Sequence, residues 1–294
     1  MNPDVRASFP VDEVASAVGA RPAEWAPVAS AGYGVVNAHW RARMGDGRRV
    51  FVKHALTSEA AGWLRKERIV YEAVRGPFMP AYFGAWDSAG TTLLVLEDLG
   101  EADWPPPWSP SGIESVLASL RALHATPPPA GLDSLEAMRQ SLDGWPLVAS
   151  GPEPLLATRL CSRAWLEEAL PALAEASAAA ELGGDELLHL DVRSDNLCLL
   201  AGRAVLVDWN LACRGNGRFD VAFWLPSLRL EGGPEPAHVL PNAGALSALV
   251  AGYFAARAGL PAPPGAPTVR EFQRAQAAVA LAWAADELGL KGAD

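Results

Sequence analysis

Apolar and polar residues alternate along the first part of the chain, and this alternation predicts β-strands. Between residues 26 and 54 the alternation is broken by a turn that contains Gly32 and Gly34 and by a second glycine-containing turn, which predicts three strands. Residues 82–86 and 91–96 predict a hairpin around the short polar segment between them. Together the five strands predict a small antiparallel sheet.

A helical period separates the third strand from the fourth. Ser58 is the expected N-cap of a helix that runs to about Val74, and Trp63, Glu67 and Val70 recur along it at the spacing of one helix face. This period places Glu67 on the apolar face. An unpaired carboxylate in a core costs on the order of several kcal/mol, so Glu67 predicts a cation close by.

The remainder of the chain is mainly helical in pattern. A tryptophan- and proline-rich segment, residues 104–108, predicts a stiff connector, because consecutive prolines favour an extended chain. Alanine- and leucine-rich segments that predict helices follow at residues 154–182, 243–258 and 269–288. We therefore expect an α+β fold with two lobes: a sheet-containing N-terminal lobe over residues 1–99 and a mainly helical C-terminal lobe over residues 100–294.

Composition and charge narrow the classes of function. The chain has 294 residues, of which 50% are hydrophobic and 20% charged, so it can bury one or two sizeable cores. A net charge of -10 argues against nucleic acid as a partner. No apolar stretch suggests a membrane span or a signal core, which favours a cytoplasmic location. The three cysteines lack metal-type spacing and are expected to be reduced, structural thiols.

The segment between residues 187 and 209 carries the most informative chemistry. His189, Asp191 and Asn196 form an H-x-D-x-x-x-x-N loop, and Asp208 ends the next apolar run. Phosphoryl transfer needs such groups: Asp191 can orient and deprotonate a hydroxyl, while Asn196 and Asp208 can hold Mg²⁺ against nucleotide phosphates. The short apolar runs between them predict a hairpin that brings Asn196 and Asp208 side by side. We therefore interpret the chain as a kinase.

Residues of the predicted sheet supply candidates for nucleotide binding. An ion pair between Lys53 and Glu67 could fix the ammonium group against phosphates. Lys53 taken alone is better explained as a solvated strand end, because lysines are common there. Gly32 and Gly34 could cover the phosphates or could simply form a tight turn. The segment from Glu97 to Leu99 could offer backbone groups to an adenine edge or be an ordinary strand end.

Three further residues near the H-x-D loop have more than one interpretation. His189 is expected to be structural, binding the backbone of its own loop, rather than a general base. Asp220 could accept hydrogen bonds from that loop or cap a helix. Arg193 could neutralise the transferring phosphoryl group, or pair on the surface with Asp195 or Glu186.

Taken in order, these motifs resemble the aminoglycoside phosphotransferase family, whose members are small-molecule kinases with a protein-kinase-like, two-lobed fold. The resemblance rests most on HLDVRSDN, which begins at His189, followed by VDW. It implies a kinase that uses ATP or GTP with Mg²⁺, with Lys53 on the phosphates, Asp191 as base, and a hinge near residues 97–99. The sequence departs from the family at Leu190 and Asn210, where a glycine is usual.

Other functions are less compatible with the sequence. A protein kinase needs a long activation segment for its peptide, and only a short segment separates Asp208 from Asp220. A catalytically inactive pseudokinase or nucleotide-binding scaffold is disfavoured because no position that the chemistry needs is substituted. We expect a small hydroxyl compound as acceptor, with antibiotics among the candidates. Residues 232–294 are close to charge-neutral and the chain contains 11 tryptophans, which favours a neutral or weakly cationic acceptor over a polycation.

Overall fold

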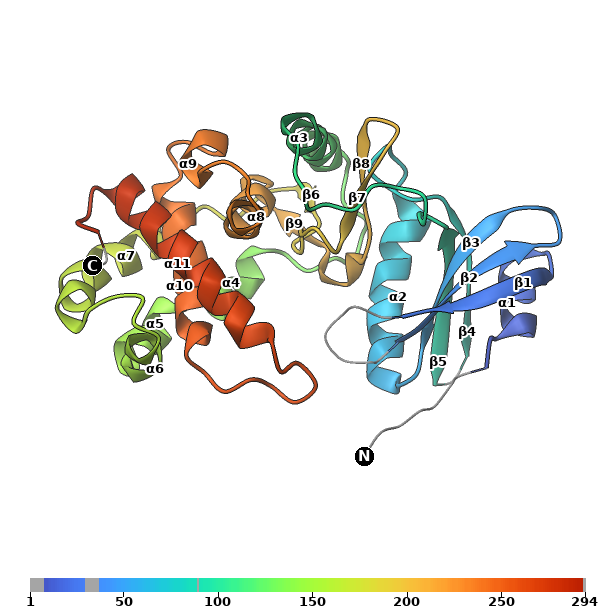
Figure 1. Cartoon of the computed structure of the whole chain (residues 1–294), viewed down its shortest axis with the longest axis horizontal. Helices are drawn as coiled ribbons and strands as arrows, with labels where there is room; N and C mark the ends of the chain where they lie inside the picture. The colour runs from blue at the N-terminus through green and yellow to red at the C-terminus, as the bar shows by residue number, and fades with distance from the viewer. Residues whose placement is uncertain (1–7, 30–36, 89, 293–294) are drawn as a thin grey trace.

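The N-terminal part of the protein is a five-stranded antiparallel sheet (Figure 1). The computed structural model of the chain describes residues 8–29, 37–88 and 90–292. The strands lie in the spatial order β1 (Pro22–Val28), β2 (Asn37–Met44), β3 (Arg49–Ala55), β5 (Thr91–Glu97), β4 (Tyr82–Ser88). The predicted strands and the hairpin between β4 and β5 are confirmed. Gly32 and Gly34 lie outside the described residues.

Side chains on β3 alternate between the two faces of the sheet, and this alternation decides which face Lys53 lies on. Val50 and Val52 on β3 are fully buried in a core with the short helix α1 (Val11–Val18). Because successive side chains point to opposite faces, Lys53 points away from that core. Lys53 is paired in register with His39 on β2 and Leu94 on β5. Leu94 belongs to the core shared with helix α2 (Ser58–Ala73).

Helix α2 covers this second face of the sheet, with two differences from the sequence prediction. The residue that caps α2 is Thr57 and not Ser58, because the Thr57 hydroxyl accepts a hydrogen bond from the backbone N of Ala60 at 3.1 Å. Trp63 is 37% exposed and so does not belong to the buried face, which includes Ala60 and Leu64 instead. Glu67 is 1% exposed, as its place on the apolar stripe predicted.

Helices dominate the C-terminal part, where the predicted helical segments are confirmed. The longer helices are α3 (Pro110–His124), α7 (Arg163–Ala178), α8 (Arg218–Leu230), α10 (Gly244–Ala258) and α11 (Val269–Leu288). The shorter ones are η1 (Glu136–Met138), α4 (Arg139–Leu142), α5 (Trp145–Ser150), α6 (Glu153–Ala157), η2 (Trp209–Leu211) and α9 (Pro236–Val239). Helix α10 packs against both α7 and α11 and is buried along much of its length, which makes it the centre of the helical core.

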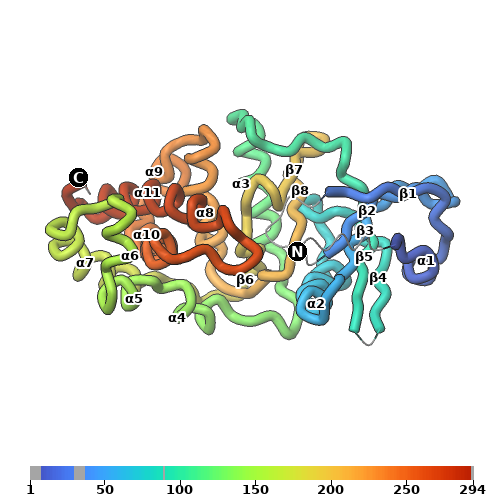
Figure 2. The backbone as a smooth tube through the Cα atoms, turned by 60° about the horizontal axis from the view of Figure 1, so that its bottom comes forward, coloured from blue at the N-terminus to red at the C-terminus, as the bar shows by residue number. Residues whose placement is uncertain are grey.

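Two small ladders lie between the sheet and the helices (Figure 2). Strand β6 (Glu186–Leu188) pairs with β9 (Cys213–Gly215), and β7 (Leu197–Leu200) forms the predicted hairpin with β8 (Arg203–Leu206). The fold is therefore α+β and two-lobed, as expected. Among the described helices, none has the length and apolar character that crossing a membrane requires. The three cysteines are buried and unpaired.

Candidate active site

The loop that joins β6 to β7 is held by a carboxylate from helix α8. Asp220, which is 1% exposed, accepts hydrogen bonds from the backbone N of His189 at 2.9 Å and from that of Leu190 at 2.7 Å. His124 of α3 lies 3.1 Å from the same carboxylate. Leu190, at a position where the resembling family has glycine, adopts a left-handed backbone with φ of 64°. Asp220 thus acts as an acceptor for the loop and does not cap a helix.

His189 is a structural residue, as predicted. Its ring is fully buried and lies 4.5 Å from the Trp209 ring, in an edge-to-face arrangement. Its Nε2 donates to the carbonyl oxygen of Val207 at 2.9 Å, and its Nδ1 accepts from the backbone N of Asp191 at 3.3 Å. Both ring nitrogens are therefore engaged in fixing the loop, and neither is available as a base.

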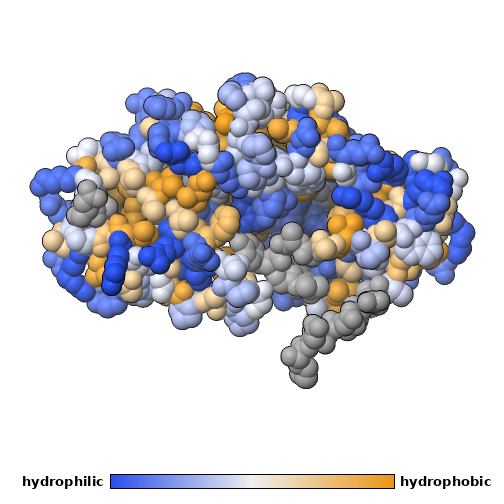
Figure 3. Space-filling view, in the orientation of Figure 1, coloured by the Kyte–Doolittle hydropathy of each residue, from blue (hydrophilic) through white to orange (hydrophobic). Residues whose placement is uncertain are grey.

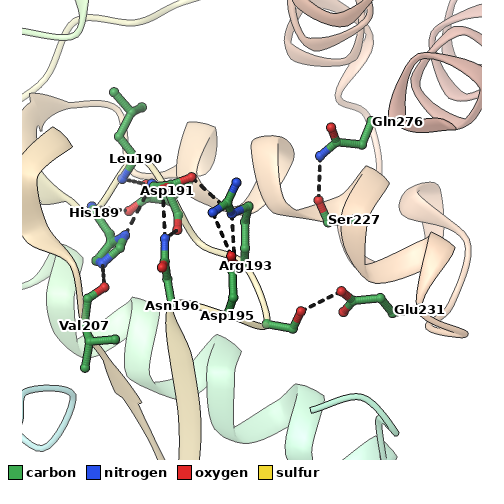
Figure 4. A network of polar contacts seen from close by, with 12 residues as sticks. His189, Leu190, Asp191, Arg193, Asp195, Asn196, Val207, Ser227, Glu231 and Gln276 are labelled. Atoms are coloured by element: carbon green, nitrogen blue, oxygen red, sulfur yellow. Dashed lines mark hydrogen bonds and ion pairs between the residues drawn. The ribbon is translucent and has the colours of Figure 1, made fainter. Parts of the chain in front are cut away.

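Asp191 is presented at the surface of this fixed loop (Figure 4). The Asn196 amide nitrogen donates to Asp191 Oδ2 at 2.8 Å and to the Asp191 carbonyl oxygen at 3.0 Å. The Asp191 side chain is 22% exposed. Burial raises the pKa of Asp191 above its usual value, and Arg193 and His189 oppose this rise. A carboxylate with a raised pKa is the better proton acceptor.

Arg193 contacts the carboxylates on both sides of it. Its Nε and Nη2 bind Asp195 at 3.0 and 2.9 Å, and its Nε lies 3.5 Å from Asp191 Oδ1. Glu186, the other partner considered for it, instead accepts a hydrogen bond from the backbone N of Gly217 at 2.6 Å. The expected ion pair between Arg193 and Asp195 is thus present. Arg193 also lies beside Asp191, and its role toward a phosphoryl group stays a prediction.

Lys53 links the sheet to Asp208, which follows the hairpin after the H-x-D loop. Its Nζ lies 2.6 Å from Glu67 Oε1 and 3.0 Å from Asp208 Oδ1. Because Lys53 is 7% exposed, the alternative of a solvated strand end is wrong. Although burial lowers it, the charges of Asp208 and Glu67 raise the pKa of Lys53 above its usual value. The ammonium of Lys53 in turn lowers the pKa of Asp208 to about 2.

Asn196 and Asp208 are suited to bind Mg²⁺. Asn196 directly precedes β7 and Asp208 follows β8. The hydrogen bond from Val207 N to Asn196 O at 2.9 Å brings these two ends of the hairpin together. The Asn196 nitrogen is engaged by Asp191, which leaves the amide oxygen as a ligand, and the Asp208 side chain is 42% exposed. No cluster of three or more potential metal-binding His, Cys, Asp or Glu side chains occurs in the described part of the chain. This donor set fits Mg²⁺, which commonly takes one or two protein ligands together with substrate phosphates.

The segment from Glu97 to Leu99 leaves the sheet as expected. The Glu97 side chain accepts a hydrogen bond from the backbone N of Ala81 at 2.9 Å, so this carboxylate is engaged inside the sheet. The Leu99 carbonyl oxygen accepts from Trp104 Nε1 at 3.3 Å. The Glu97 carboxylate is thus engaged within the protein, and the binding of a nucleotide base by the backbone of this segment stays a prediction.

Asp98, between these two residues, has a role that the sequence did not reveal. Its side chain is 3% exposed and lies 3.1 Å from Arg41 and 3.2 Å from Arg49. It also accepts a hydrogen bond from the backbone N of Gly100 at 3.0 Å. Asp98 thereby fastens the end of β5 to β2 and β3. No local pattern could indicate this, because both arginines lie on strands distant in the chain.

A cavity opens beside Asp191 and Arg193 on the helical side. Its other lining residues come from the H-x-D loop and from α8, α10 and α11: Val192, Phe223, Ser227, Tyr253, Phe254, Val269, Phe272, Gln273 and Gln276. No tryptophan lines it; Trp145, Trp209 and Trp224 are fully buried in the core. The aromatic rings that line this cavity are those of phenylalanine and tyrosine.

Comparisons with known proteins agree with this geometry. A model of the phosphotransferase enzyme family matches residues 30–260. Among solved structures, a choline/ethanolamine kinase family protein from Mesorhizobium loti is similar at 16% identity, covering 95% of this chain and 97% of that chain with a TM-score of 0.60. An amicoumacin kinase, solved in complex with AMP-PNP and Ca²⁺, is similar at 10% identity, covering 92% of this chain and 91% of that chain with a TM-score of 0.56. No curated protein sequence matches the chain significantly.

Proposed function

Since the chain belongs to the phosphotransferase enzyme family, we propose that it transfers the γ-phosphoryl group of ATP or GTP to a hydroxyl group of a small molecule. The observation that carries this proposal is that Glu67 and Asp208 both lie within 3.0 Å of Lys53 Nζ. The hairpin contact between Val207 and Asn196 joins this group to the linked pair of Asp191 and Asn196. Phosphoryl transfer requires a cation on the phosphates, metal ligands and a base together in one place.

Each group has a role in the proposed reaction. Lys53 binds phosphate oxygens and Glu67 holds its ammonium group in position. Asn196 and Asp208 hold Mg²⁺, which when bound neutralises charge on the phosphates. The backbone between Glu97 and Leu99 receives the nucleotide base.

Asp191 is the proposed base. The acceptor oxygen attacks the γ-phosphorus, the bond from that phosphorus to the β–γ bridging oxygen breaks, and the acceptor's proton passes to the Asp191 carboxylate. Asn196 orients this carboxylate through the bond at 2.8 Å, and Arg193 lies 3.5 Å from it, where its charge can stabilise the transferring group.

The similar structures support a small-molecule acceptor but differ in its identity. Their names refer to choline or ethanolamine and to amicoumacin. A non-catalytic nucleotide-binding scaffold is the competing function, and turnover separates the two.

Substitution of Asp191 tests the proposal. Asp191→Asn should leave Mg²⁺-dependent ATP binding nearly unchanged and lower turnover at least about 100-fold, the usual scale for a lost general base. Asp185→Asn, at a side chain that is 92% exposed, is the matched control and should retain full activity. Equal turnover of Asp191→Asn and the control would refute the base assignment. Nucleotide binding without transfer to any acceptor in a broad panel would favour the scaffold.

A further inference from the structure

The cavity beside Asp191 is lined mainly by apolar and uncharged polar side chains. If the proposed kinase activity is correct, this cavity holds the acceptor, because it lies directly beside the proposed base. We infer that the acceptor is an uncharged alcohol with an apolar body, and that amine cations are disfavoured. The inference rests on the charges, the ring contacts and the amide groups of the lining.

The charges of the lining do not suit a cation. Asp191 is the one carboxylate among the described residues that line the cavity, and Arg193 lies 3.5 Å from it. An ammonium group that approached Asp191 would meet a guanidinium of like charge. A polyamine requires several carboxylates in its site, and the remaining lining residues are neutral.

The aromatic rings do not form a cation cage either. Such a cage needs open ring faces around the ammonium group. The Tyr253 ring already carries the Arg257 guanidinium 3.7 Å from its centroid. Phe223 and Phe254 stack on each other at 5.4 Å with an interplanar angle of 10°. These rings therefore offer apolar contact, and Phe272, which is 47% exposed, extends that contact to the rim.

Two amide side chains supply uncharged polar contacts. Gln276 Nε2 donates to Ser227 Oγ at 2.8 Å (Figure 4), which leaves the Gln276 carbonyl oxygen as an acceptor for a ligand hydroxyl. Gln273 Oε1 accepts from Arg270 at 2.6 Å, which leaves the Gln273 amide nitrogen as a donor. A pocket of apolar walls with a few fixed polar groups is typical of sites for uncharged organic ligands.

The molecular surface agrees with this lining. Figure 3 shows apolar surface gathered over the helical part in the region of α11, next to a hydrophilic hollow between the helices and the sheet. An acceptor could thus place its apolar body against the helices and direct one hydroxyl toward Asp191. The nucleotide phosphates would meet Lys53, which lies on β3 of the sheet.

A pair of isosteric alcohols tests the inference on the full chain. Choline and 3,3-dimethylbutan-1-ol have nearly the same shape, and only choline carries a charge. With saturating ATP and Mg²⁺, the neutral alcohol should have the higher kcat/KM by at least about tenfold, since only the charge differs. Cyclohexylmethanol and kanamycin extend the comparison to a larger neutral alcohol and to a polyamine. Equal kcat/KM values, or a preference for choline or kanamycin, would overturn the inference.

Variants of the lining sharpen this test. Gln276→Glu should shift the ratio of kcat/KM values toward choline by about tenfold or more, because it adds a carboxylate to the cavity. Gln276 is 6% exposed, so Phe272→Glu at the exposed rim provides a second variant that the fold should tolerate. Gln140→Glu, on α4 and outside the cavity lining, is the control and should leave the ratio unchanged. An unchanged ratio in both lining variants would also count against the inference.

The outcomes separate this inference from the proposed function. Mg²⁺-dependent nucleotide binding and transfer to each acceptor are measured in the same samples. Absence of both would contradict the kinase activity itself. Transfer that favours the cation would leave the kinase activity standing and contradict the assigned acceptor class.

Discussion

Substitution of Asp220 tests how much its hydrogen bonds to the H-x-D loop contribute to stability. Its Oδ1 accepts from the backbone N of Leu190 at 2.7 Å, and its Oδ2 accepts from that of His189 at 2.9 Å. Asp220→Asn conserves the size of the side chain but replaces one of these acceptors by an NH₂ group. In either orientation of the amide, one backbone N–H then faces a donor and loses its partner.

The expected loss of stability follows from these contacts. A buried donor left without an acceptor costs about 1–3 kcal/mol. The surviving hydrogen bond also loses its charge assistance, and Leu190 sits in a left-handed conformation with φ of 64° that needs both bonds to hold it. We therefore expect the free energy of unfolding to fall by roughly 2–4 kcal/mol. With an unfolding entropy of about 2.1 cal/mol/K per residue, this corresponds to a melting temperature lower by roughly 3–6 °C.

Thermal unfolding and kinetics together check this expectation. Asp220→Asn should lower kcat by displacing Asp191, while Mg²⁺-dependent nucleotide binding at 25 °C or below changes little, because Lys53 and Asp208 stay in place. Asp185→Asn again supplies the control at an exposed carboxylate. A melting temperature within about 1 °C of that control would show that the loop does not depend on Asp220.

Three further predictions address the charged groups. Because burial raises the pKa of Asp191 and a base must be deprotonated, kcat/KM should fall as the pH drops through this raised pKa. Arg193→Ala removes a positive charge that lowers the pKa of Asp191, so the loss of kcat/KM should begin at a higher pH in the pH–rate profile of this variant. Asp208→Ala should abolish the Mg²⁺ dependence of nucleotide binding, measured by titration with and without the metal, and full retained dependence would place the metal elsewhere. Alanine variants of Lys53 and Glu67 should each lower kcat/KM, and the double variant should cost much less than the sum of the two; additive losses would mean that the two residues act independently.

The elements that the sequence predicts well are those with local signals. The alternation that defines β3 and the period that places Glu67 on the buried face of α2 arise from neighbouring residues, and the structure confirms both. The H-x-D loop is equally local, since Asp191 and Asn196 lie within one short segment. The division of the chain at residue 99 stays a prediction.

The features that the sequence missed depend on contacts between distant segments. Thr57 and Ser58 are both good capping residues, and only the direction of the chain entering α2 decides between them. Asp98 is a buried acceptor because arginines from β2 and β3 converge on it. The cavity beside Asp191 is assembled from three helices that are separated in the chain, so its aromatic residues share no sequence pattern.

The two carboxylates that contact Lys53 differ in a way that suits an exchange of partners. Glu67 is 1% exposed and lies 2.6 Å from the ammonium, whereas the Asp208 side chain is 42% exposed and lies at 3.0 Å. A buried carboxylate cannot give up its cation without a large cost, but an exposed one can be solvated or can bind a metal instead. The ammonium of Lys53 lowers the pKa of Asp208 to about 2, so this carboxylate is ionised near neutral pH while the contact with Lys53 is present. With Mg²⁺ and a nucleotide bound, Glu67 would therefore keep Lys53 in place, while Asp208 would be the carboxylate available to the metal and Lys53 the cation available to the phosphates.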